Sequence, residues 1–185
     1  MHHLSRQMTP CGVHDGWMSD PPTAASAAPD SAPANGLRTM FASGLLAGSV
    51  ALVTGGGTGL GRAIAEGLSA AGATVVIAAR RTEVLEAAAA EITAATGNPV
   101  TVDLVDIRNR ESVEALAGRH EVDILVNNAG GQFPQEARRF SPNGWNSVID
   151  LNLNGTWSMT QVFGNQMLDG DGGVIVQIVA IVGRG

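Results

Sequence analysis

The sequence predicts an α/β protein in which helices cover both faces of one doubly wound parallel sheet. From residue 49 onward, short apolar runs alternate with longer segments that have helical spacing. The apolar runs are mostly continuous, as expected of strands that are buried on both faces. With 185 residues and 44% hydrophobic content, the chain is long enough to bury one such core.

The N-terminal segment, residues 1–44, shows no apolar periodicity and holds five of the eight prolines. This composition predicts a disordered tail, and its acidic residues argue against a secretory signal. Met40 opens a natural lead-in to the first apolar run, so we expect it to be the natural start of the chain. The folded domain is then expected over residues 45–185.

Composition excludes several classes of function. A net charge of −6 does not favour binding to nucleic acid or to an anionic membrane, and the apolar run at residues 45–53 is too short to span a bilayer. The only cysteine, Cys11, excludes an internal disulfide and fits a reducing compartment, from which we expect a cytoplasmic protein. The four histidines lack the spacing of metal ligands, so no metal site is expected.

The first two strand–helix pairs are well marked. Residues 49–54 form an apolar run, and the helical pattern over residues 59–71 ends at Gly72. A second apolar run over residues 74–79 precedes an alanine-rich helical segment over residues 82–96. Glycine directly after a helical segment is a common helix end, and both predicted helices are followed by one.

The remaining elements repeat this alternation. Residues 100–105 are predicted to form a strand and residues 110–118 a helix, and the apolar run at residues 122–127 predicts the fourth strand. One long helix is expected over residues 142–168. It ends at a glycine-rich turn, and the last strand is expected over residues 174–182.

The turn between the first strand and the first helix reads Thr54-Gly-Gly-Gly-Thr-Gly-Leu-Gly61. Gly55 allows a tight turn, whereas Gly59 and Gly61 let the backbone approach a pyrophosphate and let the helix pack closely on the sheet. The phosphates would lie at the helix N-terminus, beside Thr58 and Leu60, where free N–H groups favour negative charge. A strand before the loop and a helix after it predict a Rossmann-type dinucleotide site.

Two arginines, Arg80 and Arg81, follow the second strand directly. Proteins that prefer NAD usually place an acidic residue near this point to hold the ribose 2′-hydroxyl group. Guanidinium groups suit a 2′-phosphate instead, which favours NADP (NADPH) over NAD. The alternative is that both are solvated charges at a helix start.

Two further motifs follow later strands. Asp106 comes after the third strand, where its carboxylate can accept a hydrogen bond from the adenine amine, with Ile107 against the ring. Asn127-Asn-Ala-Gly130 ends the fourth strand, and its small residues leave room for the nicotinamide ribose. We therefore add Asn128, Ala129 and Gly130 to the predicted site. A solvated loop acid and an ordinary Asn-Gly turn are the respective alternatives.

With the addition of Asn152 in Asn152-Leu-Asn-Gly155, the chain resembles the short-chain dehydrogenase/reductase family, whose motifs occur in the same order along the sequence. The resemblance covers residues 45–185, about the N-terminal two-thirds of that fold, and implies a sheet that is incomplete at its C-terminal side. It also implies that full-length relatives form homo-oligomers. The segments Asn127-Asn-Ala-Gly-Gly-Gln-Phe-Pro134 and Gly172-Gly-Val-Ile-Val176 are most similar to the enoyl-CoA and 2,4-dienoyl-CoA reductase branch. That branch implies hydride transfer from NADPH to a small-molecule substrate, an enoyl-CoA-like or carbonyl compound.

The resemblance also identifies what is missing. In family members, Ser, Tyr and Lys act together with an asparagine that matches Asn152. Asn152 is therefore the one catalytic residue that the resemblance implies here. The alternative is that Asn152 is a polar residue on a solvent-exposed helix face. The serine position corresponds to Ala180, and the chain contains neither Tyr nor Lys. Two alternatives to an active reductase therefore stay open. One is a truncated, catalytically inactive NADP-binding fragment, and the other is a regulatory nucleotide sensor.

Overall fold

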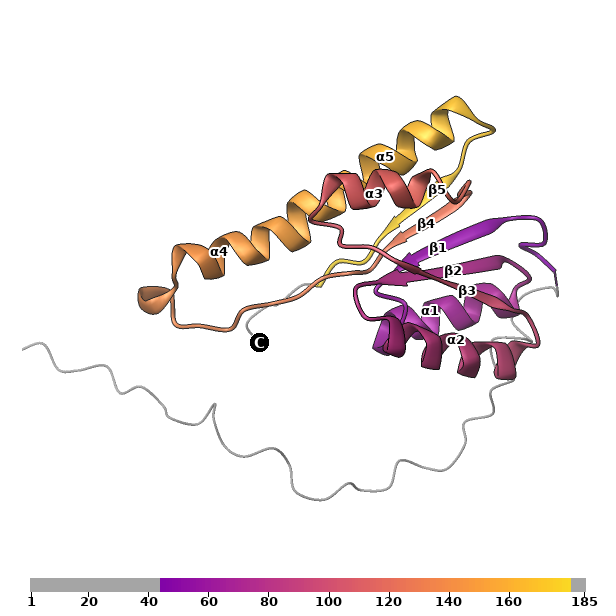
Figure 1. The fold of residues 1–185 in the computed structure, drawn as a ribbon, viewed down its shortest axis with the longest axis horizontal. Helices are drawn as coiled ribbons and strands as arrows, with labels where there is room; N and C mark the ends of the chain where they lie inside the picture. Colours follow the sequence, from indigo (N-terminus) through magenta and orange to yellow (C-terminus); the bar gives the residue numbers. More distant parts are fainter. Residues whose placement is uncertain (1–43, 181–185) are drawn as a thin grey trace, which may run out of the picture. The chain divides into compact units, whose positions relative to one another are not determined.

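The computed structural model describes residues 44–180 and confirms the predicted α/β fold with a parallel sheet (Figure 1). Residues 1–43 and 181–185 lie outside the described part. The expected N-terminal tail, Met40 and the last two residues of the predicted fifth strand are therefore not described. Among the described residues, no helix combines the length and the apolar character needed to cross a bilayer.

Strands and helices follow one another along the chain as the sequence predicts, with differences in the last third. The elements are β1 (Val50–Thr54), α1 (Gly59–Ala70), β2 (Thr74–Ala79), α2 (Thr82–Thr96), β3 (Val100–Leu104), α3 (Arg110–Ala117), β4 (Ile124–Asn127), η1 (Ala137–Arg139), α4 (Pro142–Ile149), η2 (Asp150–Gly155), α5 (Thr156–Asp169) and β5 (Val174–Gln177).

The sheet separates two layers of helices (Figure 1). Alternate residues of each strand point to opposite faces. On one face, strand residues such as Val53 and Ile77 pack with α1 and α2, whose contribution includes Leu85. On the other face, residues such as Leu52 pack with α3 and α5, whose contribution includes Phe163. Burial on both faces explains why the strands appear as continuous apolar runs.

The strand order is β3-β2-β1-β4-β5, and each neighbouring pair is parallel. The chain moves outward from β1 to β2 and β3, then returns to place β4 on the other side of β1. In open α/β sheets, ligands bind at the carboxyl ends of the strands where the order reverses in this way. The topology therefore places the candidate site at the carboxyl ends of β1 and β4.

In the structure, the single helix expected over residues 142–168 is divided into three elements. Ser141 begins α4 by accepting a hydrogen bond from the Gly144 N–H at 3.0 Å, and Asp150–Gly155 forms a π-helical segment, η2, before α5. Asn152 lies inside η2 and donates to the Val148 carbonyl at 3.0 Å. The prediction of one regular helix was wrong because a π segment depends on tertiary contacts that hydrophobic spacing does not reveal.

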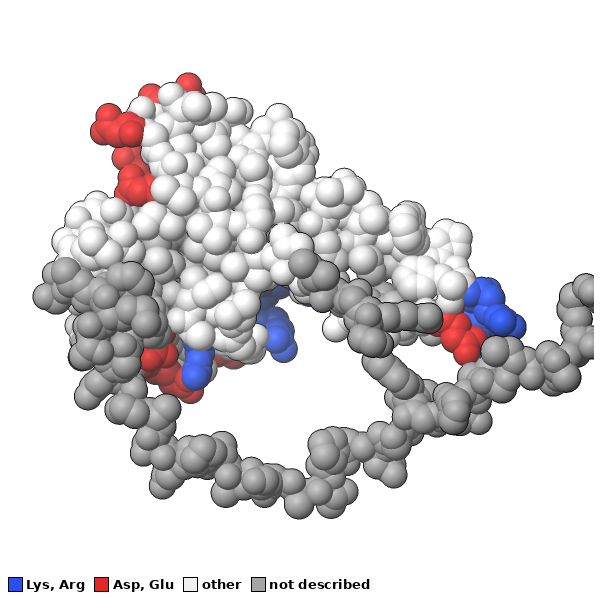
Figure 2. All heavy atoms as spheres, turned by 180° about the vertical axis from the view of Figure 1, so that it is seen from behind, with Lys and Arg blue, Asp and Glu red and all other residues white. Residues whose placement is uncertain are grey.

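The fifth strand is shorter than expected: β5 ends at Gln177, and residues 178–180 are not in a strand. Its end is held by Thr160 of α5, whose hydroxyl accepts from the amides of Gln177 at 2.9 Å and Asn127 at 3.1 Å. Within residues 44–180, β5 pairs only with β4, and its outward-facing Val174 and Val176 are exposed. Figure 2 shows a broad uncharged surface between separate groups of charged atoms.

The opposite edge of the sheet, β3, carries a charged cluster instead. Burial raises the pKa of Asp103, but hydrogen bonds from Arg119, His120 and the Leu104 N–H outweigh it and hold the pKa below its ordinary value. Arg119 donates to both carboxylate oxygens at 2.9 Å. An inward-facing charge of this kind also discourages pairing with another strand edge.

The Asp103→Asn substitution is expected to lower the free energy of unfolding at pH 7 by about 1–2 kcal/mol, because it removes a charge-assisted pair. A carboxyl whose pKa falls on folding stabilises the folded state above its unfolded pKa, and that contribution disappears as the pH drops through the folded pKa. The difference between wild type and variant should therefore shrink below about pH 4. Urea unfolding from pH 3 to pH 7 measures it.

A matched control is Asp171→Asn, since Asp171 forms no ion pair among the described residues. It should leave the free energy of unfolding within about 0.5 kcal/mol of wild type. A gap between Asp103→Asn and wild type that stays constant down to pH 3 would contradict the assignment.

Candidate functional site

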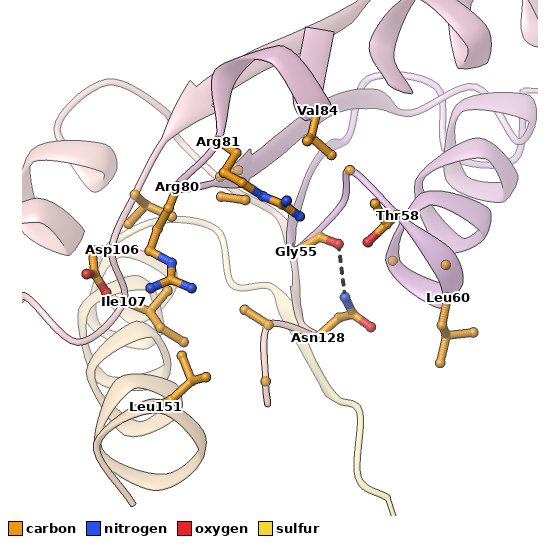
Figure 3. Close-up of a pocket in the computed structure, with 18 residues that line it drawn as sticks. Gly55, Thr58, Leu60, Arg80, Arg81, Val84, Asp106, Ile107, Asn128 and Leu151 are labelled. Atoms are coloured by element: carbon orange, nitrogen blue, oxygen red, sulfur yellow. Dashed lines mark hydrogen bonds between the residues drawn. The ribbon is translucent and has the colours of Figure 1, made fainter. Parts of the chain in front are cut away.

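A cavity of about 380 Å³ opens at the carboxyl ends of β1, β2, β3 and β4 (Figure 3). This volume lies at the lower end of the range of small-molecule sites. The residues that the sequence predicts to bind the cofactor all line it. They are Gly55, Thr58, Gly59, Leu60, Gly61, Arg80, Arg81, Asp106, Ile107, Asn128, Ala129 and Gly130. Their role in binding stays a prediction, but the fold brings them together around one space.

Three glycines of the loop between β1 and α1 have different structural roles. Gly55 has φ +68°, and its N–H donates to the Ala78 carbonyl at 2.7 Å, which anchors the turn on β2. Gly61 is buried, and a Cβ there would overlap the Gly55 carbonyl oxygen and the Asn128 side-chain nitrogen. Gly59 has φ +52°, and a Cβ there would point into open space. No side chain fills this space, so the backbone at Gly59 is open to a ligand.

Thr54 and Asn128 fasten the loop to the end of β4. The Thr54 hydroxyl accepts from the N–H groups of Asn128 and Ala129, each at 3.0 Å. The Asn128 side-chain amide donates back to the Thr54 carbonyl at 2.9 Å. It also donates to the Gly55 carbonyl at 3.3 Å, the bond marked in Figure 3. This reciprocal set fixes the floor of the cavity before any ligand enters.

The N-terminus of α1 faces this cavity. Thr58 is its N-cap in an extended conformation, and its side chain makes no capping hydrogen bond. The first turn contains no acidic residue. The helix therefore presents uncapped N–H groups and its positive dipole end beside Gly59 and Leu60, an arrangement that fits a diphosphate.

Arg80 and Arg81 carry positive charge into the same cavity. Both are exposed residues that follow β2, and their guanidinium groups turn toward the cavity in Figure 3. Among residues 44–180, Arg62, Arg108, Arg110 and Arg119 form ion pairs, whereas Arg80 and Arg81 form none. Neither guanidinium group is therefore held in an ion pair within the described part of the chain, although the charge of Arg80 acts on the Asp106 carboxylate from a longer distance.

Asp106 has a partner that sequence analysis did not predict. Arg108 donates to both carboxylate oxygens, from Nε at 2.9 Å and from Nη2 at 2.6 Å, and its own N–H donates at 3.1 Å. The pKa of Asp106 is lowered chiefly by the Arg108 side chain, against the effect of burial, with a further contribution from the charge of Arg80. The carboxylate is therefore fixed in its ionised form and retains acceptor capacity toward a ligand.

Ile107 and η2 connect the outer part of the cavity to the long helical segment. Ile107 is buried, and a Cβ placed on Gly155 would lie 2.8 Å from its Cγ1. Leu151, also in η2, lines the cavity itself. The close approach requires glycine at position 155 and seats η2 against the loop that carries Asp106.

Asn152 does not line the cavity. Its side chain holds Gly131 at both ends: Oδ1 accepts from the Gly131 N–H at 2.9 Å, and Nδ2 donates to the Gly131 carbonyl at 2.7 Å. This fixes the chain next to Gly130, which does line the cavity. Ala180 is exposed, lies beyond the end of β5 and is not part of the cavity wall.

Sequence analysis missed several wall residues. Some could have been found, because they stand at the carboxyl ends of strands or inside the glycine motif, whereas Leu151 had no signal in an apparently regular helix. The residues missed are Gly57, Ala78, Ala79, Val84, Val105 and Leu151. Over the described part of the chain, no three His, Cys, Asp or Glu side chains gather as a metal site.

Comparison with known proteins agrees with this geometry. The family model described as short chain dehydrogenase matches residues 49–185. The chain is 42% identical to a probable 2,4-dienoyl-CoA reductase of Caenorhabditis elegans, over 72% of this chain and 45% of that protein. It is 36% identical to the 3-oxoacyl-[acyl-carrier-protein] reductase of Chlamydia trachomatis, over 76% of this chain and 59% of that protein.

A solved structure shows the same similarity. The citronellol catabolism dehydrogenase of Pseudomonas aeruginosa superposes with a TM-score of 0.70 at 38% identity, over 76% of this chain and 59% of that one. The chain spans about half the length of the curated relatives it matches.

Proposed function

Because this chain belongs to the short-chain dehydrogenase family, an oxidoreductase family, we propose that it binds NADP(H) in the cavity at the carboxyl ends of its strands. We propose further that its catalytically complete form reduces an enoyl-CoA-like or related carbonyl compound. The first proposal concerns residues that the structure describes. The second concerns an activity that also needs groups outside them.

One observation carries the choice of cofactor. Arg80 and Arg81 turn into the cavity and form no ion pair among residues 44–180, at the position where an acidic residue would hold a ribose 2′-hydroxyl group. Two guanidinium groups whose hydrogen-bond donors are not engaged in ion pairs would attract a 2′-phosphate and form charge-assisted hydrogen bonds with it. NAD(H) offers no charge at this point.

The other wall residues then have distinct roles. Gly59 and the N-terminus of α1 would hold the diphosphate, while Asp106 and Ile107 would hold the adenine. Asn128, Ala129 and Gly130 would leave room for the nicotinamide ribose, and Asn152 would keep that segment in place through Gly131. Bound NADPH would supply the hydride; the described residues orient it by shape and by fixed dipoles.

The substrate class is supported by similarity. By their names, one of the relatives given above is a probable reductase of 2,4-dienoyl-CoA and the other a reductase of 3-oxoacyl-[acyl-carrier-protein]. We propose an acyl-CoA-like small molecule for the complete form of this protein, together with a cytoplasmic location and homo-oligomeric assembly. We propose no nucleic-acid or membrane partner.

A second function, nucleotide binding without turnover, is favoured by a specific observation. The 185 residues contain no Tyr and no Lys, and the position expected for the serine holds Ala180. Within this sequence no side chain of the expected type can donate the proton that follows hydride transfer. We therefore propose that this chain alone binds NADP(H) and does not reduce substrate.

Isothermal titration of the full chain with NADPH and NADH tests the assignment of the cofactor. We expect NADPH to bind at least about tenfold more tightly, because the 2′-phosphate adds charge-assisted contacts. Equal affinities would contradict the assignment of NADP(H).

An assay of NADPH oxidation with a 2-enoyl-CoA tests the proposal of binding without catalysis. Oxidation should be undetectable, and turnover at about 1 per second or faster would contradict the proposal.

A further inference from the structure

Charge is distributed unevenly along the cavity wall. The charged wall residues are Arg80, Arg81 and Asp106, and all three follow β2 or β3. The wall that follows β4 consists of uncharged Asn128, Ala129 and Gly130. Leu151 of η2 is also apolar; its Cδ2 lies 3.1 Å from the place of a Cβ on Gly131, next to this wall, and its side chain lies beside Ile107 in Figure 3.

The polar side chains near the β4 end are already engaged by the protein. Both N–H groups of the Asn128 amide are committed to the carbonyls of Thr54 and Gly55. The Asn152 amide donates to the carbonyls of Gly131 and Val148, and its oxygen accepts from the Gly131 N–H. These amides stabilise the wall and have no free donor with which to recognise a ring.

From this asymmetry, and resting on the proposed binding of NADP(H), we infer that the chain recognises only the adenosine 2′-phosphate 5′-diphosphate half of the dinucleotide. It does not distinguish the oxidised from the reduced nicotinamide ring. The oxidised ring carries a positive charge and the reduced ring does not. A site can separate them electrostatically only through a charge placed nearby.

The groups at the other end of the cavity are sufficient in kind to bind the half that is recognised. The uncapped N-terminus of α1 fits the diphosphate, the two unpaired arginines fit the 2′-phosphate, and Asp106 with Ile107 fits the adenine. Each of these groups is present in adenosine 2′-phosphate 5′-diphosphate (2′-phospho-ADP), which lacks the nicotinamide ribose altogether. Contacts with this fragment should therefore account for nearly all of the free energy with which the chain binds NADP(H).

Isothermal titration of the full chain with NADP⁺, NADPH and 2′-phospho-ADP at one ionic strength tests the inference. We expect the three dissociation constants to agree within about threefold. A difference of about tenfold or more between NADP⁺ and NADPH, or a 2′-phospho-ADP that binds about tenfold more weakly than both, would overturn the inference and leave NADP(H) binding intact. If 5′-ADP, which differs only by the missing 2′-phosphate, binds as tightly as 2′-phospho-ADP, the inference and the proposed function fail together.

A gain-of-function variant provides a second measurement. Leu151→Glu places a negative charge on the uncharged part of the wall, and Leu151→Gln is its uncharged control of similar size. We expect the glutamate variant to bind NADP⁺ at least about fivefold more tightly than NADPH and the glutamine variant to bind both equally. Equal binding of both ligands by the glutamate variant would overturn the inference that the uncharged wall is what makes the two redox forms bind alike, because a charge on this wall would then not act on the nicotinamide ring.

Discussion

Gly61→Ala is expected to weaken NADPH binding by about 100-fold or more, equivalent to roughly 3 kcal/mol. A Cβ at this buried position would overlap the Gly55 carbonyl oxygen and the Asn128 side-chain nitrogen. Both belong to the reciprocal hydrogen bonds that fix the cavity floor, so the loop must move away from β4 to make room. Such overpacking should also lower the free energy of unfolding by about 1–3 kcal/mol. Titration calorimetry and urea unfolding measure the two effects.

Gly118→Ala is the matched control. Gly118 follows α3 with a right-handed helical φ of −69°, and a Cβ there would have ordinary contacts at 3.6 and 3.7 Å. The same change of residue should leave NADPH affinity unaltered and shift the free energy of unfolding by less than about 1 kcal/mol. A Gly61→Ala variant that binds NADPH as wild type does would show that this loop does not hold the ligand.

The double substitution Arg80→Ala/Arg81→Ala is expected to weaken NADPH binding by at least about 100-fold, since charge-assisted hydrogen bonds contribute about 1.5–3 kcal/mol each. NADH binding should change by less than about threefold, because NADH has no 2′-phosphate for these groups to contact. The preference for NADPH should therefore disappear. Competition between the two nucleotides, followed by calorimetry, measures the ratio directly.

Arg138→Ala/Arg139→Ala removes the same total charge elsewhere. These arginines lie in η1, are exposed, form no ion pair within the described part of the chain and do not line the cavity. NADPH affinity should stay within about twofold of wild type at 0.15 M salt, where exposed charges more than a Debye length away are screened. Similar losses in both double variants would indicate a general charge effect rather than a specific phosphate contact.

Most of the fold could be predicted because its signals are local. Buried parallel strands appear as apolar runs, glycines mark the helix ends at Gly72 and Gly97, and the loop at Thr54–Gly61 lies where a strand meets a helix. The twelve predicted cofactor residues converge because the carboxyl ends of parallel strands meet at one edge of the sheet.

The errors have tertiary causes. The run after Gln177 remains apolar, so sequence alone extended β5, whereas the structure ends it where the Gln177 side chain meets Thr160. Arg108 could not be assigned to Asp106 from sequence, because a loop arginine two residues away has many possible conformations. Leu151 was missed because its position depends on η2.

The π segment has a consequence for insertions and deletions. A π turn accommodates one residue more than an α turn, so α4 and α5 are out of phase by about one residue, or roughly 100° of rotation. Deleting one residue from Asp150–Gly155 would restore a continuous α-helix and put its two ends on different faces from those they now occupy. Either Phe163 would leave the core, or Ser141 and the start of α4 would turn away from their present position. The number of residues in Asp150–Gly155 therefore matters more for the packing of α4 and α5 than which residues they are.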